Sequence, residues 1–189
     1  MWKTHGFVII FGSGGWYLTI FTLFKINFPI HINEITFAQM AEITQQGSFK
    51  FTTSKDGQMQ IFDPVRNKFV VNTPEEWVRQ NTLKYFTEEL GFPKSLIAVE
   101  KQFQLHRRKK RTDIVVYNNN GEPVILVECK RPSVKITQAA FDQAFRYNIY
   151  LKVPYLVITN GEELYCCLVK GEKVEFLEGI PSYNDLSEK

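Results

Sequence analysis

Asp113, Glu128 and Lys130 are spaced so that they could form a small catalytic centre. Asp113 precedes one apolar run, Glu128 ends the next, and Lys130 follows two residues later. Opposed carboxylates repel each other, and their apolar neighbours raise that cost. Lys130 supplies one positive charge, and a divalent cation would supply two. Carboxylates without a histidine or thiolate partner fit Mg²⁺, or Mn²⁺ in its place, better than zinc. The alternative is a structural ion pair between one acid and a nearby Lys or Arg.

The segment between the two acids predicts that they face each other. Residues 118–121 read Asn-Asn-Asn-Gly, which is typical of a tight β-hairpin turn. A two-residue turn at the last two positions pairs Asn119 with Glu122. Counting outward from that pair places Asp113 opposite Glu128, and a symmetric four-residue loop gives the same result. Paired residues point to the same side of a sheet, and the lysine two residues beyond shares that side.

Polar and basic residues near these acids are candidates for nucleic-acid contact. Gln143 and Tyr147 share one face of a predicted helix, close to Arg146. A run of five basic residues shortly before Asp113 could bind phosphates. The alternatives are an ordinary polar helix surface and a solvated loop. The candidate nucleic-acid-binding residues are Gln143, Arg146, Tyr147, Arg107, Arg108, Lys109, Lys110 and Arg111.

The first long helix, predicted over 73–90, opens with two acids. Thr73 suits the N-cap, a proline follows at the first helical position, and Glu76 completes a capping box. Glu75 has no such structural role, apart from an i, i+4 pair with Arg79. Glu75 is therefore a further candidate for the catalytic centre.

The hydrophobic pattern predicts an α/β unit in which two helices pack against one mixed sheet. After the first helix we expect strands at 95–105, 113–117 and 124–128, a helix at 137–151, and strands at 155–159 and 164–169. The expected divisions of the chain are an apolar extension at 1–30, N-terminal strands within 31–72, the α/β domain at 73–170, and a charged, poorly patterned tail at 171–189.

Composition fits one globular domain in a reducing compartment. The chain has 189 residues, is 44% hydrophobic, and carries a formal net charge of +3, which permits an anionic partner. Its cysteines, at 129, 166 and 167, lack metal-clamp spacing, and its histidines, at 5, 31 and 106, are scattered. We therefore expect no zinc site and no structural disulfide.

The segment 7–24 carries no charge and is just long enough for a membrane span. Its glycines weaken a helix, and no clear A-x-A cleavage site marks a signal peptide. The glycines do not form a P-loop, because no Lys-Ser/Thr follows them. A start codon assigned too far upstream, a membrane anchor and a packed structural segment all stay open as interpretations.

Several sequence blocks resemble a known family. The stretches RTDIVVY (111–117), VILVECK (124–130) and QAFRY (143–147) look like the PD-(D/E)-x-K nuclease superfamily. A closer resemblance is to the N-terminal nuclease domain of type I restriction enzyme R subunits. It is carried, between about 60 and 168, by EEWVRQ (75–80), GFPKSLIAVEKQ (91–102), VECKRPSVKITQ (127–138), FDQAFRYN (141–148) and YLVITNGEELYC (155–166).

This resemblance implies a restriction-endonuclease-like αβββαβ core and a Mg²⁺-dependent DNA endonuclease. It implies that Asp113, Glu128 and the backbone carbonyl of Cys129 are metal ligands. It further implies that Lys130 positions or activates the attacking water. Gln143 and Tyr147 match the family's Q-x-x-x-Y element, and Glu75 matches its first-helix acid. The domain 73–170 would then be the nuclease-like domain.

The sequence departs from that family in two respects. It has no Walker A loop and is too short for a helicase motor, so we expect a separate motor or specificity subunit to supply those functions. Its apolar start matches nothing in the nuclease pattern. We expect a cytoplasmic DNA-binding protein that meets a membrane only if 7–24 is an anchor. The alternative function is a non-cleaving DNA- or partner-binding module with the same fold.

Overall fold

The computed structural model describes residues 49–105, 108–171 and 173–187. It also gives the backbone of three short strands, β1 (Phe11–Gly12), β2 (Gly15–Trp16) and β3 (Ile26–Asn27). Apart from these strands, the extension 1–30 and all interpretations of 7–24 lie outside the described residues. No helix in the described part of the chain is long and apolar enough to cross a membrane.

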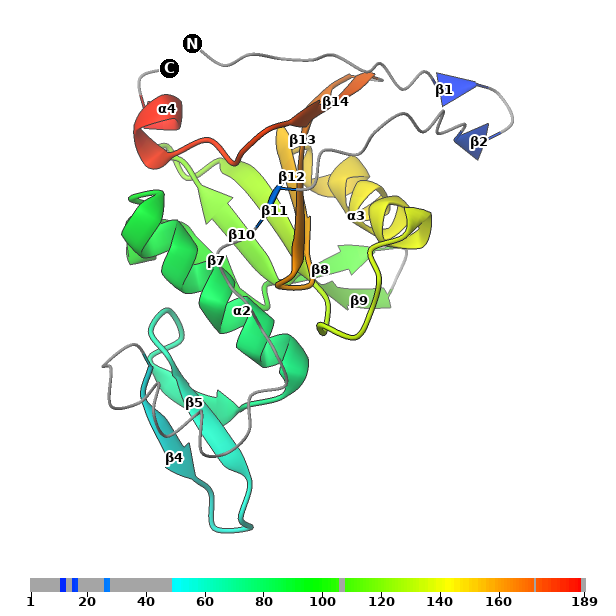
Figure 1. Ribbon diagram of the computed structural model, residues 1–189. Coiled ribbons are helices and arrows are strands. Elements are labelled where there is room, and N and C mark those ends of the chain that lie inside the picture. Colours follow the sequence, from blue (N-terminus) through cyan, green and yellow to red (C-terminus); the bar gives the residue numbers. More distant parts are fainter. Residues whose placement is uncertain are drawn as a thin grey trace.

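A mixed β-sheet forms the centre of the molecule, with one helix against each face (Figure 1). Its strands run in the order β14-β13-β12-β11-β10-β7, and β3 also pairs with β13. Their bounds are β7 (Ile97–Val99), β10 (Ile114–Tyr117), β11 (Pro123–Cys129), β12 (Tyr155–Thr159), β13 (Glu163–Lys170) and β14 (Lys173–Leu177). Only β11 and β12 are parallel among the described neighbours on this path. The predicted α/β class, with a mixed central sheet flanked by helices, is confirmed.

Two helices cover the described sheet, and one of them connects its parallel strands β11 and β12. Helix α3 (Gln138–Leu151) returns the chain from the end of β11 to the start of β12, as a parallel connection requires. Helix α2 (Pro74–Lys84) continues through a π-helical turn (Tyr85–Glu89) and covers the opposite face. The elements α2, β7, β10, β11, α3 and β12 follow one another in the expected helix and strand order, with a small β-ribbon inserted after β7.

Strands β10 and β11 contribute to two apolar layers. Ile114 and Val127 belong to the layer beneath α2, whereas Val115 and Leu126 belong to the layer beneath α3. All four are at most 1% exposed, which explains why both strands read as continuous apolar runs. Full burial of each such side chain stabilises the fold by about 1.5–3 kcal/mol. The two strands are therefore a firm support for the polar residues at their ends.

A separate antiparallel sheet precedes α2. It consists of β4 (Phe51–Thr53), β5 (Met59–Asp63) and β6 (Lys68–Val71), paired in that order. The Phe49 and Phe51 rings lie 5.0 Å and 6.2 Å from the Trp77 ring of α2, measured between centroids. This aromatic contact anchors the small sheet on the first half of α2.

The expected strand 95–105 is interrupted in the structure. A 3-10 turn (Lys94–Leu96) leads into β7, and Glu100, with a φ of 52°, bends the chain before β8 (Gln102–Leu105). The basic run that follows is a strand rather than a loop, because β9 (Arg108–Arg111) pairs with β8. The hydrophobic pattern did not reveal the break at Glu100, because glutamate rarely adopts a positive φ and so gives no signal of a bend.

The segment after Gly171 is more ordered than its charged pattern indicates. Strand β14 pairs with β13 along its length, and helix α4 (Tyr183–Ser187) follows it. Ile180 is buried, and the Tyr183 ring packs edge-on against Phe92 at 5.8 Å between centroids. The expectation of a poorly patterned tail at 171–189 is therefore wrong for the described residues of this segment.

Candidate active site

The hairpin between β10 and β11 positions the two candidate acids. Its turn differs from the predicted one, because the Asn118 N–H donates to the Glu122 carbonyl at 2.9 Å. The Gly121 N–H donates to the Asn118 carbonyl at 3.0 Å, and Gly121 has a φ of 78°. The loop thus contains three residues, and the predicted Asn119–Glu122 pair is wrong. Glycine is required at the end of this loop because its φ is positive.

A bulge in β11 restores the register that the three-residue loop shifts by one position. Tyr117 pairs with Pro123 and Val116 pairs with Ile125, which leaves Val124 as the extra residue. Beyond the bulge Ile114 pairs with Val127. Continued outward by one residue, this register would place Asp113 opposite Glu128, as expected from the sequence, but Asp113 itself lies outside β10.

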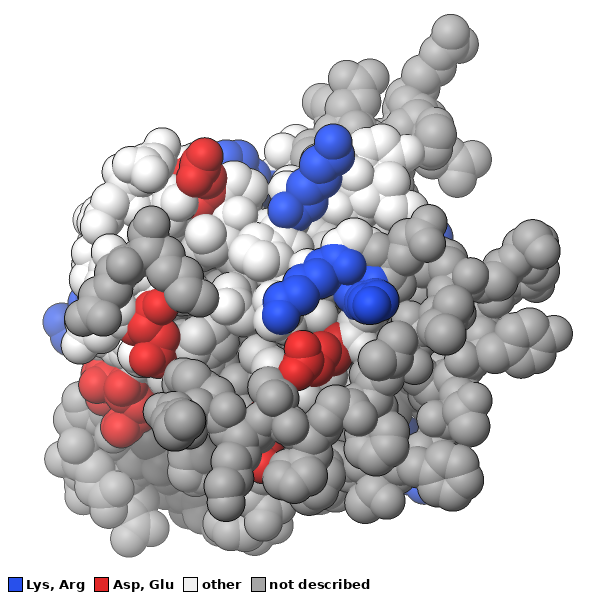
Figure 2. Space-filling view, turned by 90° about the horizontal axis from the view of Figure 1, so that it is seen from above, with Lys and Arg blue, Asp and Glu red and all other residues white. Residues whose placement is uncertain are grey.

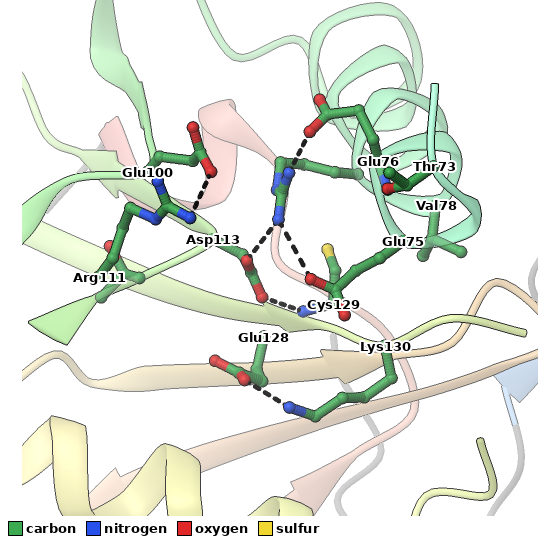
Figure 3. A network of polar contacts seen from close by, with 12 residues as sticks. Thr73, Glu75, Glu76, Val78, Glu100, Arg111, Asp113, Glu128, Cys129 and Lys130 are labelled. Carbon is green, nitrogen blue, oxygen red and sulfur yellow. Dashed lines mark hydrogen bonds and ion pairs between the residues drawn. The ribbon is translucent and has the colours of Figure 1, made fainter. Parts of the chain in front are cut away.

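Asp113 lies where the chain bends into β10, and both of its carboxylate oxygens accept hydrogen bonds. Oδ1 accepts from Arg79 Nη2 at 2.7 Å, and Oδ2 accepts from the backbone N–H of Cys129 at 2.7 Å (Figure 3). Strict alternation would point Asp113 toward α3, like Val115, yet Arg79 belongs to α2. Asp113 is thus held from the α2 side, although its charge still acts on Glu128, and the expectation that both carboxylates share one side of the sheet stays a prediction. The two donors turn Asp113 toward the end of β11.

Glu128 lies on the α3 side of the sheet and is 5% exposed. Its Oε1 accepts from Lys130 Nζ at 2.6 Å and from the side-chain amide of Gln143. Burial, and after it the negative charge of Asp113, raise the pKa of Glu128 to about 7. The two acids therefore interact electrostatically, although Arg79 holds one of them and Gln143 the other.

Lys130 is fixed at the start of the loop that follows β11. Its backbone N–H donates to the Thr159 carbonyl at 2.8 Å, which continues the parallel pairing of β11 with β12. Burial lowers the pKa of Lys130, but the contact with Glu128 outweighs it, and the net pKa is raised. The ammonium group therefore stays charged at neutral pH, next to the buried carboxylate.

One polar face of α3 reaches this centre. Gln143 Oε1 accepts from Lys130 Nζ at 3.4 Å, and Gln143 Nε2 donates to the Tyr147 hydroxyl at 3.5 Å. Arg146 is exposed on the same helix. Burial, and then the charge of Glu128, raise the pKa of Tyr147, while the charge of Arg146 acts against this rise. The structure thus brings the predicted Gln143 and Tyr147 beside Glu128 and leaves Arg146 at the edge.

The first turn of α2 approaches from the other side. Thr73 caps the helix as predicted, since its hydroxyl accepts from the Glu76 N–H at 3.1 Å. The reciprocal half of the capping box is wrong, because the Glu76 carboxylate binds Arg66 and Arg79. Glu75 is 46% exposed and lies 3.6 Å from Arg79. After burial and Asp113, the charge of Glu75 is a further contribution that raises the pKa of Glu128.

Two arginines have roles in the centre that the sequence did not predict, since Arg79 was expected only as the i, i+4 partner of Glu75. Arg79 is buried and contacts Glu76 and Asp113, and Arg66 joins the β5–β6 turn to α2. A basic residue within a buried helical stretch is a signal that could have identified Arg79, because such a charge requires partners. No local pattern marks Arg66, because its role depends on the packing of the small sheet.

Carboxylates outnumber basic side chains in the charge network around the centre. Ion pairs and charge contacts connect six carboxylates, Asp63, Glu75, Glu76, Glu100, Asp113 and Glu128, with four basic side chains, Arg66, Arg79, Arg111 and Lys130. With every group ionised, two negative charges in this set lack a counter-charge, and carboxylate oxygens are ligands that Mg²⁺ and Mn²⁺ prefer. No group of three His, Cys, Asp or Glu side chains within the described ranges converges on one point. A cation here would therefore need backbone, water or phosphate oxygens as further ligands.

The basic run contributes one described side chain to the edge of the centre. Arg111 is 58% exposed and pairs with Glu100 at 3.1 Å (Figure 3). The side chains of 107–110 are outside the description, so their contact with nucleic acid stays a prediction. At the upper end of the molecule, described acidic and basic side chains are interspersed (Figure 2). The described part of that end therefore does not present a surface of one charge sign.

Comparison with known proteins gives similarities in sequence and in structure. The family model for the type I restriction enzyme R protein N-terminus matches residues 74–181. In structure, the chain is similar to a fragment described as an HsdR subunit of a type I restriction enzyme from Vibrio vulnificus YJ016, with 18% sequence identity and a TM-score of 0.44. That similarity covers 57% of this chain and 24% of the other, so it spans about a quarter of the longer chain. No curated protein matches the chain.

Proposed function

Because this chain belongs to the type I restriction enzyme R protein N-terminus family, we propose that it is a nuclease-type domain that hydrolyses phosphodiester bonds of DNA with Mg²⁺. The observation that carries the proposal lies at the ends of β10 and β11. There Asp113, which directly precedes β10, is near enough for its charge to raise the pKa of the buried Glu128, whose carboxylate accepts a hydrogen bond from Lys130. Paired acids beside a charged lysine are groups that metal-assisted phosphoryl transfer uses.

In this proposal Asp113, Glu128 and the backbone carbonyl of Cys129 hold the cation. When bound, the cation would polarise a phosphoryl oxygen and lower the pKa of a coordinated water. The excess of carboxylates over basic side chains, counted with every group ionised, supports this assignment. The raised pKa of Glu128, caused by burial and by Asp113, also indicates a carboxylate whose charge is incompletely compensated.

The protein's own residues supply charge and position. Lys130 offers a fixed positive charge that would offset negative charge developing on the phosphate in the transition state. Gln143 holds both Glu128 and Lys130 through its side-chain amide. Glu75 and Tyr147 are partly exposed extensions of the same centre. We propose that Arg146 and the basic residues 107–111 contact the DNA backbone.

The test is cleavage of supercoiled and linear DNA by the purified full chain with Mg²⁺, Mn²⁺ or EDTA. Wild-type protein should cut only with a divalent cation. Lys130→Ala should lower the cleavage rate on the order of 10²-fold or more, because a charge that stabilises the transition state is lost. Lys170→Ala is the matched control, since Lys170 is an exposed lysine at the end of β13. Equal cleavage by wild type and Lys130→Ala, with both folded, would refute the assignment.

The same experiment separates cleavage from simple binding. A non-cleaving module would shift the mobility of DNA with or without Mg²⁺ and would leave every substrate intact. We further propose that a separate subunit supplies the motor or the sequence specificity. Cleavage of any plasmid sequence by the chain alone would indicate that specificity comes from elsewhere.

A further inference from the structure

We infer that Arg66 and Arg79 form a positioning relay, a chain of ion pairs through which the small N-terminal sheet fixes the orientation of the Asp113 carboxylate. The inference rests on the proposed function, because it gives a purpose to the orientation of Asp113. The links of the relay are Asp63, Arg66, Glu76, Arg79 and Asp113, in that order. It begins before residue 74, and therefore outside the part of the chain that matches the family model.

The first link fixes Arg66 to the turn between β5 and β6. Asp63 is fully buried, and its Oδ1 accepts the backbone N–H groups of Val65 and Arg66 at 2.8 Å and 2.7 Å. Its Oδ2 accepts from Arg66 Nε at 2.6 Å. Because Asp63 holds both the backbone and the side chain of Arg66, the guanidinium leaves this turn in one defined direction.

The second link joins that guanidinium to α2. Arg66 Nη2 donates to Glu76 Oε1 at 2.5 Å. Gln80 strengthens the junction, since its Nε2 lies 2.8 Å from both Asp63 Oδ2 and Glu76 Oε1. Glu76 and Gln80 are buried, and buried hydrogen bonds to charged groups are strong and short. A displacement of the turn would therefore displace the Glu76 carboxylate.

The third link reaches the candidate active site. Arg79 donates to Glu76 Oε2 through Nη1 and to Asp113 Oδ1 through Nη2 at 2.7 Å. Each oxygen of Glu76 thus serves one arginine, and the planar guanidinium of Arg79 sets the angle between its two acids. Asp113 in turn fixes the end of β11, because its other oxygen accepts a hydrogen bond from the Cys129 N–H.

A purely structural ion network would behave differently from a positioning relay. Lysine keeps the positive charge of arginine but offers one compact donor group, which cannot bridge two carboxylates in a fixed plane. If the network only balances charge, Arg→Lys variants should retain the geometry of Asp113. If it positions Asp113, the same variants should release the Cys129 N–H even when the protein stays folded.

The test uses amide hydrogen exchange of Cys129, measured by ¹⁵N NMR on the full chain without metal, together with DNA cleavage at saturating Mg²⁺. In Arg66→Lys and Arg79→Lys, Cys129 should exchange on the order of tenfold faster, and cleavage should fall by a similar factor. The control Lys170→Arg makes the reverse substitution between lysine and arginine in an exposed ion pair. It should change neither the exchange rate of Cys129 nor the cleavage rate.

Two outcomes would overturn the relay. One is an exchange rate at Cys129 equal to that of wild type in folded Arg66→Lys. The other is an exchange rate and a cleavage rate both equal to those of wild type in Arg79→Lys. If Arg66→Lys fails to fold, Asp63→Asn breaks the same first link and is judged by the same exchange rate. If wild-type protein cuts no DNA with Mg²⁺ or Mn²⁺, the proposed function fails, while Cys129 exchange still decides the relay.

Discussion

Cation binding to this centre should strengthen between pH 6 and pH 8, because Glu128 must lose its proton to become a ligand. Burial and the charge of Asp113 raise the pKa of Glu128 to about 7. With that pKa, its ionised fraction is about one tenth at pH 6 and about nine tenths at pH 8, so Mn²⁺ affinity should rise about tenfold, or about 1.4 kcal/mol. A glutamate with an ordinary pKa would be ionised throughout this range and would give no rise.

Isothermal titration calorimetry with Mn²⁺ measures this directly. Titrations at pH 6 in two buffers of different ionisation enthalpy should also show release of close to one proton per bound ion, about 0.9 from the same ionised fraction. Glu128→Gln is the control, since it keeps the shape of the side chain and removes its titration. The reasoning is refuted if wild-type affinity is equal at pH 6 and pH 8, or if Glu128→Gln shows the same rise.

Three further predictions concern stability. Without metal, the pKa of Glu128 is higher in the folded chain than in the unfolded chain. At pH values between these two pKa values the folded chain therefore binds an extra proton, so the free energy of unfolding should fall by up to about 3 kcal/mol as pH rises from 5 to 8. Urea denaturation in EDTA should show this fall in wild type and not in Glu128→Gln. Thr73→Ala should cost about 1 kcal/mol by loss of the α2 N-cap, and Thr73→Ser should restore most of it. Leu126→Ala should cost about 2–5 kcal/mol, whereas the exposed Ile149→Ala should change stability by less than about 0.5 kcal/mol; equal costs would contradict the assigned core.

The core strands and α3 could be read from the sequence because their signals are local. The runs that form β10, β11 and β12 are buried on both faces and are rich in β-branched residues, which identifies strands without knowledge of their neighbours. The loop length could not be read in the same way. Asn-Asn-Asn-Gly satisfies a two-residue or a three-residue turn equally well, because Gly121 supplies the positive φ in either. The register was still right, because the bulge at Val124 cancelled the error.

The side on which Asp113 is held could not be predicted, because it depends on contacts between distant segments. Alternation along β10 points Asp113 toward α3, yet Arg79 of α2, 34 residues away, and the Cys129 N–H hold its carboxylate. The capping box failed for the same reason, since Arg66 and Arg79 compete for the Glu76 carboxylate. Local spacing therefore identified which acids matter, while tertiary packing decided how each one is oriented.

The bulge at Val124 also bears on how the hairpin can evolve. Deletion of one residue there would convert the ladder to a regular one and leave Ile114 opposite Val127. An extra residue between Ile125 and Glu128 would instead rotate every later side chain to the reverse face. Among relatives, insertions and deletions should accumulate at the loop and the bulge, while the short spacing from Ile125 to Glu128 stays invariant. The tip of the hairpin can thus drift in length across a lineage without disturbing the acids at its base.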